Sequence, residues 1–193
     1  MCVLAPKSLV GWLAVMAMFC GTRSAVAADA GTPLFSAFES FCADTGARAD
    51  DVKRAVLAAG GAPHDPPTRS VETPFSMQTS LWDIKAGGHA LVVAAGAAHT
   101  AGAAARAMND CVVSGRDVDA ASLKALADWA RVAANPDANE RLTYYVFEEK
   151  NGAHQAISDA KAAEAEGRVW RLSVIRAPGV ASVELMHLLA PER

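Results

Sequence analysis

The pair Cys42 and Cys111 constrains the fold of this 193-residue chain more than any other feature of its sequence. A bond between the two thiols would hold an early segment against a much later one. In the chain-entropy model, closing a loop of that length stabilises a fold by about 4 kcal/mol. Disulfides persist in oxidising compartments and are rare in the cytosol. The destination of the chain therefore decides how the two cysteines are interpreted.

The N-terminal segment predicts export. Lys7 gives a basic start, residues 9–21 form an uncharged apolar run, and Ala25 and Ala27 follow in the A-x-A spacing of a cleavage site. These three parts are typical of a secretory signal peptide, which we place at residues 1–27. The apolar run is shorter than the ~20 residues of a spanning helix, so we expect no stable membrane anchor after cleavage.

An alternative reading of the same segment makes Cys20 the lipid-modified residue of a lipoprotein. A lipidated cysteine usually follows a small residue, whereas Phe19 precedes this one. We therefore favour a cleaved signal peptide and a periplasmic or secreted location.

Cleavage leaves Cys42 and Cys111 as the two cysteines of residues 28–193. An even count in an exported chain predicts a disulfide between them. No C-x-x-C pair indicates a zinc ribbon or a redox site, and no histidine lies close in sequence to form a reactive thiolate. A Cys-His pair that is assembled only in space stays open as an alternative.

Length and charge limit the domain count and the partners. Residues 28–193 match the size of one domain. Loss of Lys7 and Arg23 leaves 16 Lys and Arg residues against 21 Asp and Glu, which is a net charge of −5. We therefore expect no nucleic-acid partner, because such partners favour a basic patch.

The first half of the mature chain predicts helices followed by strands. Phe35, Phe38 and Phe41 recur at helical spacing and give one helix face an apolar stripe. The expected elements are a helix from Pro33 to Gly46, a helix over 50–59, an irregular proline-rich loop over 62–70, strands over 75–86, 89–95 and 106–115, and a small-residue loop over 96–105.

The second half predicts one helix followed by strands. Leu123, Leu126 and Trp129 form a helix face that begins after Asp117 or Asp119. The expected strands are 141–150, 153–158, 168–176 and 181–189, with a helical turn or loop at 159–167. Gly87-Gly88 and Asn151-Gly152 are both typical of two-residue hairpin turns.

The element order favours an α+β domain. Short connections favour antiparallel pairing, because parallel strands need long crossovers. We expect an antiparallel sheet of about six strands with helices packed on one face, in the order α-α-β-β-β-α-β-β-β. In this arrangement Cys42 faces a strand, where Cys111 can meet it.

The candidate chemistry is sparse. The sequence has no G-x-S-x-G elbow, no histidines paired at i+2 or i+4, and no nucleotide-binding glycine motif, so we expect no catalytic residue, metal or cofactor. Asp110 is expected at a solvated strand position, and His187 is expected at an edge or surface position. The candidates for a ligand groove are aromatic residues on the predicted strands, although strand spacing favours a core role for them: Trp82, Tyr144, Tyr145 and Trp170.

The signal peptide, "LFSAFESFC" in the first mature helix, "CVV" in a later strand and the "LKALADWA" helix together resemble one protein family. It is an uncharacterised family of small exported two-cysteine proteins of Gram-negative bacteria. The resemblance covers most of residues 33–135. It implies export and a paired cysteine, and it brings no established activity.

We therefore expect a non-catalytic binding or envelope-associated domain whose partner is an envelope protein or a small ligand. One alternative is an exported hydrolase whose site is assembled in space from at least two of His89, His99, His154, His187, Glu148 and Asp110. Another is an inhibitor or immunity-type protein that presents a loop, either 62–70 or 96–105.

Overall fold

The computed structural model describes residues 33–64, 78–99, 107–165 and 168–189. The predicted signal peptide at 1–27, with Cys20, lies outside these residues, as does most of the proline-rich loop. No helix in the described ranges combines the length and the apolar character needed to cross a membrane.

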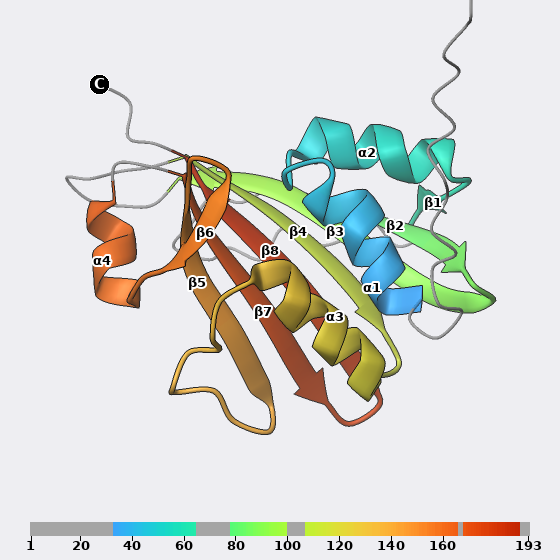
Figure 1. Cartoon of the computed structure of the whole chain (residues 1–193). Coiled ribbons are helices and arrows are strands. Elements are labelled where there is room, and N and C mark those ends of the chain that lie inside the picture. Colours follow the sequence, from blue (N-terminus) through green and yellow to red (C-terminus); the bar gives the residue numbers. More distant parts are fainter. Residues whose placement is uncertain (1–32, 65–77, 100–106, 166–167, 190–193) are drawn as a thin grey trace, which may run out of the picture.

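The described residues form four α-helices, one π-helical turn and eight strands (Figure 1). The helical segments are α1 (Pro33–Phe38), the π-turn η1 (Glu39–Ala43), α2 (Ala49–Ala58), α3 (Ala120–Ala130) and α4 (Asp159–Glu164). The strands are β1 (Ala62–Pro63), β2 (Gln78–Ala86), β3 (His89–His99), β4 (Ala107–Gly115), β5 (Leu142–Lys150), β6 (Ala153–Ala156), β7 (Arg168–Ala177) and β8 (Val180–Leu188).

All eight strands belong to one antiparallel sheet, in the order β1-β2-β3-β4-β8-β7-β5-β6. The prediction of an α+β fold on a single antiparallel sheet is confirmed. The junction of β4 with β8 joins the two halves, because β2, β3 and β4 come from the first half of the chain and β5, β7 and β8 from the second. This junction makes β8 an interior strand.

The strand count of about six was too low, and β1 shows why. Ala62 and Pro63 pair with Asp83 and Trp82 at the sheet edge, inside the segment that was expected to be irregular. Proline is tolerated in an edge strand, where its missing N–H leaves no ladder bond open. The small-residue loop expected over 96–105 was also wrong for residues 96–99. Strand β3 continues to His99, and these residues pair with β4.

Both predicted two-residue turns close hairpins. Gly87 and Gly88 have φ values of +56° and +82° between β2 and β3, and Asn151 and Gly152 have +53° and +75° between β5 and β6. Left-handed φ at both central positions is the requirement of a type I′ turn, and glycine and asparagine meet it with little strain.

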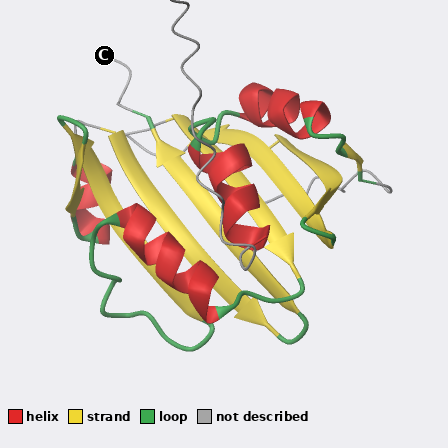
Figure 2. Ribbon diagram, turned by 45° about the vertical axis from the view of Figure 1, so that its right-hand side comes forward, coloured by secondary structure: helices red, strands yellow, loops and turns green. Residues whose placement is uncertain are grey.

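Three helices and the π-turn cover one face of the sheet, whereas α4 lies on the other (Figures 1 and 2). Ala162 of α4 packs in a separate small core with Tyr144, Val146 and Val169, which point away from the main core. The three predicted helices share one face as expected, and α4 is the exception. Six-residue α4 lies in a segment that was expected to be a turn or a loop, and it covers only the end of the sheet near β5.

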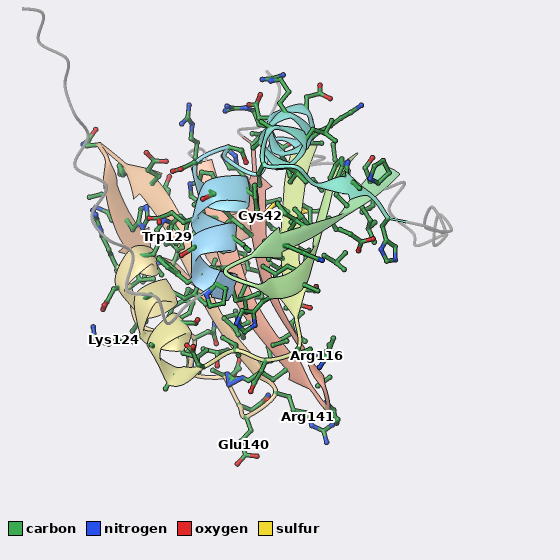
Figure 3. The ribbon with its side chains drawn as sticks, turned by 90° about the vertical axis from the view of Figure 1, so that its right-hand side faces the viewer. Cys42, Arg116, Lys124, Trp129, Glu140 and Arg141 are labelled. Atoms are coloured by element: carbon green, nitrogen blue, oxygen red, sulfur yellow. A yellow bond between two sulfur atoms is a disulfide. The ribbon has the colours of Figure 1, made fainter. Side chains whose placement is uncertain are left out.

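The predicted disulfide between Cys42 and Cys111 is confirmed. Cys42 lies in η1 and Cys111 lies mid-strand in β4, with 5.5 Å between their Cα atoms. Both residues are fully buried, and Figure 3 shows Cys42 between the helical layer and the sheet. The bond therefore ties the first helical segment to the centre of the sheet.

Aromatic rings hold α3 against the same core. Trp129 of α3 meets Phe38 of α1 edge-on, with 5.1 Å between the ring centroids, and lies 6.0 Å from Phe147 of β5. Asp119 caps the start of α3 by accepting a 2.6 Å hydrogen bond from the Ser122 N–H. The predicted apolar stripes of both helices thus face the sheet.

Candidate functional site

The helix-poor face is the side of the sheet opposite α1, α2 and α3. Strand register places its side chains in rows across β4, β8, β7 and β5. One row is Asp110, Met186, Arg171 and Val146, and the next is Val112, Glu184, Ser173 and Tyr144. Polar groups therefore gather at the middle of this face, where the two halves of the chain meet.

Asp110 is the most unusual residue of this face. Its side chain is 6% exposed, and Oδ1 has no hydrogen-bond partner among the described residues. Burial first, and then the nearby charge of Glu184, raise the pKa of this carboxyl from 3.8 to about 7, although the hydrogen bond from the Cys111 N–H lowers it. Asp110 therefore keeps its proton up to near-neutral pH, and its predicted solvated position is wrong.

Asp110 and Glu184 form a pair of acidic side chains on adjacent strands. Asp110 lies opposite Met186 and Glu184 lies opposite Val112, so the two acids are diagonal neighbours on adjacent strands. Diagonal neighbours in an antiparallel pair are about 7–8 Å apart at the backbone, within reach of such side chains. Neither carboxylate forms an ion pair with a described residue.

Ser173 adds a third polar group beside Glu184. The two residues face each other directly across β7 and β8. Ser173 is 1% exposed, and its Oγ has no partner among the described residues. A buried hydroxyl without a hydrogen bond is unfavourable by roughly 1–3 kcal/mol, so its presence here requires an explanation.

Arg171, the cation beside this pair of acids, is directed elsewhere. Its guanidinium carbon lies 4.7 Å from the centre of the Tyr144 ring, a cation–π contact. The Tyr144 hydroxyl donates to Asp159 at 3.2 Å, and the pKa of this phenol is raised by burial first and then by Asp159. Arg171 thus packs on an aromatic ring, and the Asp110–Glu184 pair is left without a counter-ion in the described part of the chain.

The four aromatic residues predicted for a ligand groove do not share one surface. Trp82, Tyr145 and Trp170 face the main core beneath the helices, where each is buried. Tyr144 points to the helix-poor face and packs near α4. The structure places these side chains on opposite sides of the sheet.

The residues suggested for a hydrolase are also dispersed. His89 lines a cavity of about 630 Å³ between the starts of α1 and α3. His154 donates Nδ1–H to the Ala130 carbonyl at 2.8 Å, which fixes it beneath α3. The side chain of His99 lies outside the described residues.

His187 was expected at an edge or surface position, and this expectation was wrong. It is buried and stacks on Trp170 with 3.8 Å between the ring centroids. Burial lowers the pKa of this imidazole, so the ring is held neutral against Trp170. Asn109 pairs with His187 across β4 and β8, and Asp110 is the next residue along β4. Successive side chains of a strand point to opposite faces, so Asp110 and His187 lie on opposite sides of the sheet. Glu148 shares the helix-poor face with Asp110, on β5.

A second, larger cavity lies beside the start of α2. Its volume is about 880 Å³, and its lining includes Arg48, Arg54 and Asn109. Both arginines pair with the single carboxylate of Asp51, so their side chains are already engaged in ion pairs. Across the described residues, no three His, Cys, Asp or Glu side chains lie close enough together to hold a metal ion.

Sequence reasoning missed the pair of acids and its neighbours. The alternation of apolar and polar residues over 168–176 predicts that Arg171 and Ser173 lie on the face opposite Trp170. The structure confirms this prediction. The missing fact was the adjacency of β4 and β8, which brings Asp110 next to Glu184.

Comparisons of the chain with protein-family models, with curated proteins and with solved structures found no match. The resemblance to small exported two-cysteine proteins therefore stays a prediction.

Proposed function

We propose that this protein is an exported, non-catalytic binding domain that holds its ligand on the helix-poor face. One observation carries the proposal: three buried polar atoms without partners among the described residues lie on this face, namely Asp110 Oδ1, Ser173 Oγ and Arg171 Nε. The other such atoms, in Trp170, Arg176 and His187, lie on the face that the helices cover. Export rests on the predicted signal peptide, and the disulfide fits an oxidising compartment.

The argument for a ligand is energetic. Valine and threonine fit a pleated sheet well and would leave no charge buried on this face. The chain instead places an acid pair and a hydroxyl there, which are unfavourable when buried without partners. A bound molecule that supplies hydrogen bonds to these atoms would remove that penalty. Polar residues at such positions are therefore better explained by binding than by folding.

The hydrolase alternative has one observation in its favour. Asp110, with a pKa raised to about 7, suits a general acid or base at neutral pH. It shares its surroundings with Glu184 and Ser173, whereas the described histidine of this face, His64, bonds to Asp83 at the β1–β2 edge of the sheet. A binding role therefore accounts for all the unpartnered polar groups of this face, whereas a hydrolase role accounts for Asp110 alone.

The test is capture from an envelope extract with the exported protein as bait. A Ser182→Tyr bait carries a bulky ring on the helix-poor face, where Ser182 Oγ lies 2.8 Å from Ser114 Oγ. A Lys124→Tyr bait carries the same ring on the exposed side of α3. We expect the component bound by the wild-type bait to be retained by Lys124→Tyr and lost from Ser182→Tyr.

Both baits are first compared with the wild type by circular dichroism and thermal unfolding, so that loss of folding is not counted as loss of binding. Equal capture by the two variants, or loss with Lys124→Tyr alone, would place the binding surface elsewhere and refute the proposal.

A further inference from the structure

We propose that the N-terminus created by removal of the signal peptide docks in the cavity between the starts of α1 and α3, where its ammonium group binds Asp117 and Asp119. The occupant is the segment 28–32, which lies outside the described part of the chain. The inference rests on the predicted signal peptide. It goes beyond the proposed function, because it concerns a different site.

The cavity lies where the described chain begins. Its volume is about 630 Å³, and Pro33, the first described residue, forms part of its wall. A Cβ atom placed on Gly87 would lie 3.5 Å from the Pro33 Cβ, so the start of α1 packs on the turn between β2 and β3. The segment that precedes Pro33 therefore leaves from the wall of this cavity.

Length and composition make the segment 28–32 a suitable occupant. Five residues span at most about 17 Å when fully extended, so the new N-terminus stays close to the cavity wall at Pro33. The segment reads Ala-Asp-Ala-Gly-Thr and has no large side chain. Its alanines suit the apolar part of the wall, to which Leu34 and Leu91 contribute.

Two carboxylates of the cavity wall complement the charge of the new N-terminus. Asp117 and Asp119 lie between β4 and α3, and each uses one oxygen to accept a backbone N–H, from Val118 at 2.8 Å and from Ser122 at 2.6 Å. Neither carboxylate forms an ion pair with a described residue. An ammonium group has three N–H donors and one positive charge, so it fits the oxygens that remain.

The other charged or titratable residues of the wall are Arg116 and His89. Arg116 is exposed and forms no ion pair within the described ranges. It can therefore pair with Asp29, the one acid of the segment. Both charges of the segment thus have an opposite charge in the cavity wall.

Cleavage of the signal peptide creates the group that binds. In the precursor, the Ala28 nitrogen belongs to an uncharged peptide bond with Ala27. Hydrolysis of this bond consumes one water molecule and leaves a carboxylate on Ala27 and an ammonium group on Ala28. The ion pair with Asp117 and Asp119 therefore forms only after cleavage, and the mature domain gains stability that the precursor lacks.

The contribution of the ion pair to stability depends on pH. A free α-amino group has a pKa of about 8, and nearby carboxylates raise it in the folded protein. The stabilisation is therefore complete below about pH 7 and is lost as pH rises through the raised pKa. The titratable and charged groups around the site are His89, Arg116, Asp117 and Asp119 of the wall, together with Asp29 of the segment.

The experiment uses the protein recovered after expression of the full chain in a Gram-negative host, and N-terminal sequencing should show that it begins at Ala28. Two forms are then compared, one with a free α-amino group and one in which this group is acetylated. We expect the acetylated form to unfold at a temperature about 2–4 °C lower at pH 6.5, as for loss of a partly exposed ion pair in a domain of this size. The difference should disappear at pH 10. In the free form, nuclear magnetic resonance should give the Ala28 amine a pKa above 8.5.

The double variant Asp117→Asn/Asp119→Asn locates the site. Asparagine keeps a side-chain oxygen for both backbone hydrogen bonds, so the start of α3 stays capped. In this variant acetylation should no longer change the unfolding temperature, and the pKa of the Ala28 amine should return to about 8. Asp137→Asn is the matched control, because Asp137 is an exposed acid that does not line this cavity, and it should preserve both effects.

Equal unfolding temperatures of the free and acetylated forms at pH 6.5, or a pKa near 8 for the Ala28 amine of the wild type, would overturn the inference. So would a recovered protein that begins at another residue. An effect of acetylation that persists in the double variant would also overturn it, because Asp117 and Asp119 would then not be the partners.

Discussion

Replacing Asp110 by asparagine should stabilise the protein at neutral and alkaline pH and have little effect in acid. The buried carboxyl must ionise as pH rises, next to Glu184 and without a counter-ion among the described residues. Asparagine has nearly the same shape and stays neutral at every pH. The variant therefore keeps the uncharged state that the folded protein favours at this position.

The magnitude follows from the pKa of the carboxyl in the folded and unfolded chains. A rise from 3.8 to about 7 corresponds, at about 1.4 kcal/mol for each pKa unit, to about 4 kcal/mol. Between these two values the folded state binds the proton more tightly than the unfolded state. The contribution of Asp110 to stability therefore falls as pH rises through this window, and the whole loss is present above pH 7.

The assay is urea unfolding of the wild type and of Asp110→Asn at pH 4, 5.5, 7 and 8.5 without reductant. We expect the free energies of unfolding to agree within about 1 kcal/mol at pH 4, where both side chains are neutral. The variant should become progressively more stable than the wild type, by up to about 4 kcal/mol at pH 8.5. Taking the difference between the two proteins removes titrations that they share.

Glu184→Gln is the matched control for the cause. Removing this charge should lower the pKa of Asp110 in the folded state, so the loss of stability becomes smaller and is complete at a lower pH, while the contribution of burial remains. A difference between wild type and Asp110→Asn that stays constant from pH 4 to pH 8.5 would refute the reasoning, because an ordinary exposed aspartate gives that result.

The remaining predictions concern stability. Joint replacement of Cys42 and Cys111 by alanine should lower the free energy of unfolding by about 4 kcal/mol, measured by denaturant unfolding against the oxidised wild type; an unchanged value would show that the loop is not constrained by the bond. Phe38→Ala should destabilise by roughly 3–5 kcal/mol, since the ring is fully buried against Trp129, and a loss below 1 kcal/mol would contradict this packing. Asp119→Ala should remove the cap of α3 and about 1 kcal/mol of stability, read from thermal unfolding, whereas an unchanged midpoint would show that the cap contributes nothing.

Local chemistry accounts for the parts of the fold that the sequence predicts well. Gly87-Gly88 and Asn151-Gly152 specify their hairpins because both turn positions need left-handed φ. The phenylalanine stripe from residue 35 specifies a buried helix face, and the cysteine count specifies a single bridge. Each of these signals acts within a few residues or through a pairing that has only one solution.

Long-range adjacency accounts for what the sequence does not predict. Nothing in the segment around Asp110 or in the segment around Glu184 indicates that β4 and β8 are neighbours. Without that pairing, Asp110 resembles a solvated strand residue and His187 resembles an edge residue. The central position of both strands turns these polar side chains into buried ones.

The candidate site also depends on long-range adjacency of strands. The aromatic residues Trp82, Tyr145 and Trp170 were plausible for a groove, but the three helical segments cover that face and bury them. The polar set on the opposite face comes from three strands that lie far apart in the sequence. Such a set becomes visible only when the strand order is known.

Nuclear magnetic resonance of the Asp110 side-chain carboxyl carbon tests the central claim most directly. The claim is that this carboxyl is buried beside Glu184 without a counter-ion among the described residues. Its chemical shift, followed from pH 3 to pH 9, should report a midpoint near 7. In Glu184→Gln the midpoint should fall, because the nearby negative charge that raises the pKa of Asp110 is gone. A midpoint near 4 in the wild type, or one that Glu184→Gln leaves unchanged, would contradict the account.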